Sequence, residues 1–88
     1  MPAPKNISVL FIEDSPHDAE LAQLSLERSG YTLSHTERVY DHQGVVEALQ
    51  RQEFHLILAD FILPGFSGSQ ALQLARQLAP QTPFIFLS

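Results

Sequence analysis

The chain is predicted to fold as one α/β domain built around a parallel β-sheet. Its apolar runs at about 7–12, 55–59 and 84–87 show almost no alternation with polar residues, which is typical of strands buried on both faces. Segments with helix-start signals or helical apolar spacing separate these runs. Strands that alternate with helices favour right-handed crossovers and therefore a parallel sheet. With 88 residues, there is room for one small domain or for part of one.

The first half of the chain is expected to form two strands joined by a helix. After the first strand, at about 7–12, Ser15 can cap a helix and Pro16 suits its first position. Gly30 can end this helix, because glycine readily adopts the backbone conformation that follows a last helical turn. Residues 32–39 alternate weakly between apolar and polar side chains, which indicates a half-exposed edge strand.

The second half repeats the alternation of helix and strand. We expect a helix capped by Asp41 and ending at about Gln52, and then a strand at about 55–59. The next helix, from Gly68 or Ser69 to about Leu78, has the clearest helical spacing of apolar residues, with Ala71, Leu74, Ala75 and Leu78 on one face. The fourth strand is expected at about 84–87.

Composition excludes several classes of function. Five basic residues against ten acidic ones give a net charge of −5, which leaves no basic stripe for direct binding of nucleic acid. There is no cysteine, hence no disulfide and no thiolate metal site. No apolar run approaches the roughly 20 residues that span a bilayer. Residues 1–6 are expected to be a disordered lead, and they lack the apolar region of a signal peptide. A cytoplasmic domain without membrane contact is therefore expected.

Three acidic residues stand where predicted strands end. Glu13 and Asp14 follow the first strand, and Asp60 follows the third. If these strands are parallel neighbours, the three carboxylates meet at the sheet edge where open α/β sheets bind ligands. Carboxylate oxygens suit Mg²⁺, and an ionised aspartate can attack phosphorus. Taken alone, an acid pair at a strand end is more often a helix cap or a solvated loop.

In their order and spacing, these residues resemble the receiver domain of two-component response regulators. Glu13 and Asp14 are similar to the family's acid pair, and Asp60 to its phosphoacceptor. Leu63-Pro64 and Gly68 match the turn that follows the phosphoacceptor, and Ser88 lies at the position of the family's switch serine or threonine. The resemblance implies a flavodoxin-like open parallel sheet of strand order 2-1-3-4, with helices on both faces.

The resemblance also implies a role for each site residue. Asp60 would accept a phosphoryl group, and Mg²⁺ would be held by Asp14 directly, by Glu13 through water, by Asp60 and by the backbone carbonyl of Ile62. Ser88 would bind a phosphoryl oxygen. The donor would be a histidine kinase or a histidine phosphotransfer domain, and an output or sensor domain of the parent protein would read the phosphorylated state. Such a domain is a phosphoprotein of signal transduction and not an enzyme with a separate substrate.

The sequence departs from the family pattern at its C-terminal end. The family continues with a helix, a fifth strand that ends in lysine, and a closing helix, whereas this chain stops at Ser88 and its single lysine is Lys5. We therefore expect residues 7–88 to be a partial receiver domain and the chain to be a fragment. The exposed fourth strand would then favour a homodimer.

Two alternatives remain open at this point. The chain could be a receiver-like interaction module that has lost phosphotransfer with its lysine. It could also be a small α/β enzyme that hydrolyses phosphate with carboxylates and Mg²⁺, although the sequence offers no separate general acid.

Overall fold

A four-stranded parallel sheet forms the centre of the computed structural model, which describes residues 5–87. The strand order is β2-β1-β3-β6, and every neighbouring pair is parallel, as predicted. The strands are β1 (Lys5–Ile12), β2 (Tyr31–Val39), β3 (Leu56–Asp60) and β6 (Phe84–Leu87). The crossover helices are α1 (Pro16–Arg28), α2 (His42–Arg51) and α3 (Gly68–Leu78).

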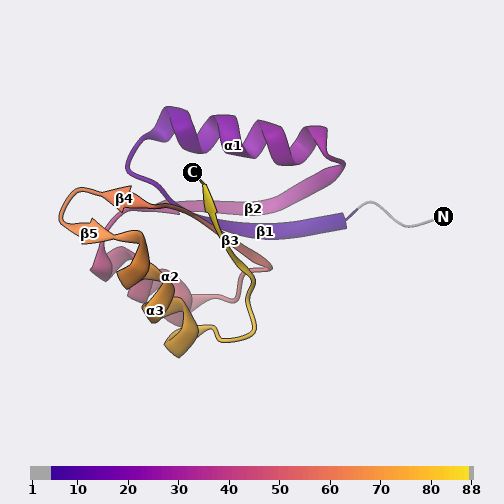
Figure 1. Ribbon diagram of the computed structural model, residues 1–88. Coiled ribbons are helices and arrows are strands. Elements are labelled where there is room, and N and C mark those ends of the chain that lie inside the picture. Colours follow the sequence, from indigo (N-terminus) through magenta and orange to yellow (C-terminus); the bar gives the residue numbers. More distant parts are fainter. Residues whose placement is uncertain (1–4, 88) are drawn as a thin grey trace.

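The helices cover both faces of the sheet (Figure 1), with α1 on one face and α2 and α3 on the other. Successive side chains of β1 point to opposite faces. Val9 and Phe11 pack in the cluster that includes Ala19 of α1, whereas Leu10 and Ile12 pack in the cluster that includes residues of α2 and α3. Both faces of β1 are thus buried over residues 9–12, which explains the continuous apolar sequence there.

Side-chain caps set the helix starts. The Ser15 hydroxyl accepts from the Asp18 backbone at the start of α1, and Asp41 Oδ1 accepts from the Gly44 backbone at 2.7 Å, as predicted. At α3, Ser67 and Gln70 form a reciprocal capping box, so this cap lies just before the predicted start at Gly68 or Ser69. Within residues 5–87, no helix combines the length and the apolar character needed to cross a bilayer.

Strand boundaries differ from the prediction by one or two residues: β2 begins one residue earlier than expected and β3 one residue later. β1 begins at Lys5, two residues earlier than expected, because Lys5 and Asn6 pair with the start of β2. Part of the expected lead therefore belongs to the sheet, while residues 1–4 lie outside the described part of the chain. β3 continues one residue further than expected, and Asp60 pairs with Leu87 of β6.

The segment after Asp60 is a small β-hairpin that the sequence did not predict. β4 (Ile62–Leu63) pairs antiparallel with β5 (Phe66–Ser67). The two-residue loop between them consists of Pro64 and Gly65, and Gly65 has φ +68°. Proline followed by a glycine of positive φ is the sequence signature of a type II turn. The predicted turn is present, and it carries two short strands.

Candidate functional site

Three carboxylates gather at the C-terminal edge of the sheet. Glu13 and Asp14 follow β1, Asp60 ends β3, and these two strands are parallel neighbours with Ile12 opposite Ala59. One carboxylate oxygen from each acid lies within 4.8 Å of the other two. The structure therefore brings together the acids that the sequence singled out.

The three acids differ in burial. Glu13 is only 4% exposed, Asp60 is partly buried and Asp14 is exposed. Burial raises the pKa of Glu13 above its usual range; the hydrogen bond from the Ser15 backbone N–H opposes this rise, and the negative charge of Asp60 adds to it. Glu13 Oε1 accepts that hydrogen bond at 3.0 Å. The buried acid is thus held in place, and the exposed acid is open to solvent.

The donor set fits a hard divalent cation. All three ligand atoms are carboxylate oxygens, which Mg²⁺ prefers, and no thiolate or imidazole takes part in the cluster. Three carboxylates so close together repel one another, and a cation between them would relieve that repulsion.

Gly68 allows the chain after Asp60 to turn tightly. A Cβ atom at this position would lie 2.7 Å from Phe86 Cε1, 2.9 Å from the Asp60 carbonyl oxygen and 2.9 Å from Phe61 Cα. The Gly68 N–H also donates to the Phe61 carbonyl oxygen at 2.9 Å. The start of α3 can therefore approach the end of β3 this closely only at a glycine.

The remaining predicted site residues are Ile62, Pro64 and Ser88. The Ile62 side chain is 77% exposed. Its backbone is held by the pairing of Ile62 with Ser67 in the hairpin. Pro64 lines a hollow of about 540 Å³ together with Asp14 and other residues. Ser88, the expected phosphate-binding residue, lies outside the described residues.

Arg38 of β2 is a site residue that sequence reasoning missed. Its Nη1 donates to the carbonyl oxygens of Glu13 at 3.2 Å and of Asp14 at 3.4 Å. Its guanidinium lies over the Tyr40 ring, 5.5 Å from the centroid, and both residues line the 540 Å³ hollow. In the sequence Arg38 is one polar residue of an edge strand, and only the pairing of β2 with β1 reveals what it contacts.

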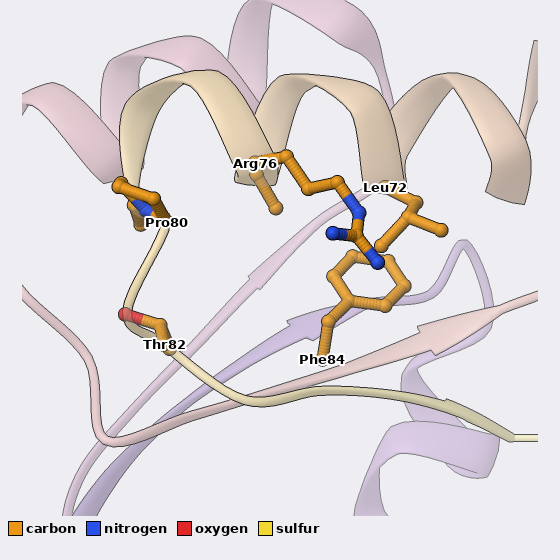
Figure 2. Close-up of a pocket in the computed structure, with 7 residues that line it drawn as sticks. Leu72, Arg76, Pro80, Thr82 and Phe84 are labelled. Carbon is orange, nitrogen blue, oxygen red and sulfur yellow. The ribbon is translucent and has the colours of Figure 1, made fainter.

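A second hollow, of about 170 Å³, lies between the C-terminal part of α3 and β6 (Figure 2). There the Arg76 and Leu72 side chains lie near the ring of Phe84. No acidic side chain lines it, so its residues offer neither a carboxylate nucleophile nor an anionic metal ligand. The carboxylate cluster remains the candidate site.

Comparisons with known proteins agree with this geometry. Residues 9–88 match the family described as response regulator receiver domain. The chain is 34% identical over 82 residues to the uncharacterized transcriptional regulatory protein YkoG of Bacillus subtilis. This alignment covers 91% of the chain and 34% of YkoG. The chain is also 30% identical over 81 residues to the autoinducer 1 sensor kinase/phosphatase LuxN of Vibrio campbellii, in an alignment that covers 92% of the chain and 9% of LuxN.

Solved structures show the same architecture. The receiver domain of the sensor histidine kinase PA1611 from Pseudomonas aeruginosa superposes with a TM-score of 0.75 at 27% identity, covering 94% of this chain and 67% of that one. That structure is described as having a magnesium ion coordinated in its active-site cleft. The chain spans about a third of the length of YkoG and a much smaller part of LuxN.

Proposed function

Because this chain belongs to the response regulator receiver domain family, we propose that it accepts a phosphoryl group on Asp60 in a two-component phosphorelay. The observation that carries this proposal is the convergence of Asp60 with Glu13 and Asp14 at one edge of the sheet. A carboxylate nucleophile beside two further acids suits phosphoryl transfer, in which positioning and charge neutralisation supply most of the catalysis.

The proposed transfer is a substitution at phosphorus. A carboxylate oxygen of Asp60 forms a bond to the phosphorus of a phosphohistidine, the P–N bond breaks, and the departing imidazole takes up a proton from water. The product is an acyl phosphate on Asp60. When bound, Mg²⁺ would neutralise the charge that develops on the phosphoryl oxygens.

The different burial of the three acids supports direct contact with Mg²⁺ for two of them and contact through water for the third. Exposed Asp14 and partly buried Asp60 would bind Mg²⁺ directly, together with the Ile62 carbonyl. Glu13 is nearly buried and already accepts a hydrogen bond from Ser15, which favours contact through a water molecule. Ser88 would bind a phosphoryl oxygen.

The partners belong to the same proposal. A histidine kinase or a histidine phosphotransfer domain would donate the phosphoryl group, and an output or sensor domain of the parent protein would respond. YkoG is described as a transcriptional regulatory protein and LuxN as a sensor kinase/phosphatase, so the relatives include both kinds of parent. We place this exchange in the cytoplasm, and we assign the chain neither direct nucleic-acid binding nor an enzymatic reaction on a separate substrate.

Transfer of labelled phosphate from a small phosphodonor, in the presence of Mg²⁺, tests the proposal. Wild type should take up label, whereas Asp60→Asn should take up none, because the amide keeps the size of the side chain but lacks the anionic nucleophile. Asp18→Asn is the matched control, since Asp18 is an exposed aspartate outside the cluster, and this variant should be labelled like wild type.

Each alternative has its own outcome in the same assay. Label on Asp60→Asn would place the acceptor elsewhere. A folded wild type that takes up no label would favour the interaction module without phosphotransfer. Continuous release of inorganic phosphate, without a lasting adduct, would favour the small hydrolytic enzyme.

A further inference from the structure

Arg38 of β2 contacts the acidic loop, which consists of Glu13 and Asp14, the two residues that follow β1. β2 pairs in parallel with β1, and Arg38 stands opposite Phe11, so its side chain reaches forward along the sheet edge to the residues that follow β1. There its Nη1 donates to the carbonyl oxygens of Glu13 and Asp14, at 3.2 and 3.4 Å. These bonds engage the main chain of both acids and do not involve their carboxylates.

Both the backbone of β2 and the Arg38 side chain form hydrogen bonds with this loop. The Glu13 N–H donates to the Val39 carbonyl oxygen at 2.9 Å, which extends the strand pairing by one residue. Asp14 lies one residue further on, and the bond from Arg38 reaches its carbonyl oxygen. Tyr40, whose ring lies under the Arg38 guanidinium, limits the positions that this side chain can adopt.

We propose that Arg38 is a positioning residue for Mg²⁺: it fixes the main chain of Glu13 and Asp14 so that their carboxylates face Asp60. This inference rests on the metal site of the proposed function. Groups that orient metal ligands from behind contribute to metal affinity even though they do not touch the ion.

The charge of Arg38 acts in the opposite direction. A cation beside a metal site repels the incoming metal, so loss of that charge alone would tighten Mg²⁺ binding. Loss of the hydrogen bonds would loosen the loop and weaken binding. Because the two effects have opposite signs, substitution of Arg38 decides between them.

The experiment measures the dissociation constant of Mg²⁺ by titration calorimetry on wild type, Arg38→Met and Arg38→Lys. Arg38→Met should raise the constant about three- to tenfold, the range that one or two net hydrogen bonds support. Arg38→Lys should recover part of the loss, since its ammonium group keeps a hydrogen-bond donor for the carbonyl oxygens of the loop. At saturating Mg²⁺, the phosphorylation rate of Arg38→Met should return to that of wild type, which locates the defect in metal affinity.

Arg51→Met is the matched control. Arg51 of α2 pairs with Glu37, which lies next to Arg38 on β2. Its substitution therefore removes an equal positive charge but no contact with the acidic loop. Its dissociation constant should stay within about twofold of wild type, because exposed charges at a distance are screened. An equal rise in Arg51→Met would overturn the inference, as would an unchanged or lower constant in Arg38→Met.

The outcomes separate this inference from the proposed function. Wild type that binds Mg²⁺ while Arg38→Met binds it equally well contradicts the role of Arg38 alone. Wild type that binds no Mg²⁺ contradicts the metal site itself and the inference with it. Thermal melts identify an unfolded variant, and if Arg38→Met is unfolded, an Arg38→Lys constant no higher than that of wild type overturns the inference.

Discussion

At the residue scale, burial of the Glu13 carboxylate carries an electrostatic cost. Its carboxylate is nearly buried, and Asp60 and Asp14 add negative charge around it, so its pKa is raised above the usual value of 4.5. In the pH range above that value, the folded chain binds more protons than the unfolded chain. Stability therefore falls as pH rises through the raised pKa, and the full cost is present at higher pH.

Glu13→Gln should stabilise the metal-free chain at neutral pH. The glutamine oxygen can still accept the hydrogen bond from Ser15, but the buried charge is gone. The gain in melting temperature should be small near the usual pKa of 4.5 and should grow as pH rises through the raised pKa. Melts in the presence of a chelator measure it, with Glu20→Gln, an exposed glutamate on α1, as the control. A gain that does not grow with pH would contradict this explanation.

The sequence predicted the acids of the site but not the residue that supports them. Glu13, Asp14 and Asp60 directly follow or end apolar runs, and parallel strands bring such ends to one edge. Arg38 acts through bonds to the main chain of a neighbouring strand. Such contacts depend on the register between β1 and β2, which no local pattern in the sequence specifies.

At the element scale, most boundaries could be predicted because local signals mark them. Ser15 and Asp41 cap α1 and α2 through bonds that their residue types suggest. The hairpin of β4 and β5 was missed because two-residue strands have no periodicity to detect, and its proline and glycine indicate only a turn.

Gly68→Ala should destabilise the fold by about 1–3 kcal/mol through overpacking at the start of α3. Alanine has a higher helix propensity, by about 1 kcal/mol at most. The overpacking should nevertheless prevail, since two of the three close atoms belong to the backbone of Asp60 and Phe61 and cannot easily move. Denaturant unfolding measures the change. Ser69→Ala, at the next and exposed position, should change stability by no more than about 0.5 kcal/mol. Equal effects of the two substitutions would contradict the packing argument.

At the scale of the whole molecule, the two edges of the sheet differ in character. In the described part of the chain, β2 and β6 each have one unpaired side. β2 carries polar and charged residues such as Glu37 and Arg38, whereas β6 consists of Phe84–Leu87 with Ile85 half exposed. Uncharged apolar edges favour pairing between chains.

The 88-residue polypeptide, expressed as it stands, should therefore associate through β6. Ile85→Lys places a charge on this edge and should shift the population toward monomer, because a buried lysine at a strand pair is costly. Light scattering coupled to size exclusion measures the mass of both proteins. A wild type that remains monomeric at high concentration would contradict the prediction, and so would an Ile85→Lys variant that associates as strongly as wild type.

The central claim concerns one Mg²⁺-dependent phosphoacceptor at Asp60, and tandem mass spectrometry tests it most directly. The chain is incubated with a small phosphodonor, with Mg²⁺ or with a chelator, and the modified residue is located by fragmentation. We predict a single phosphoryl group on Asp60 that forms with Mg²⁺ and is largely absent with the chelator. A phosphoryl group on another residue, or equal modification of Asp60 without any divalent metal, would contradict the account.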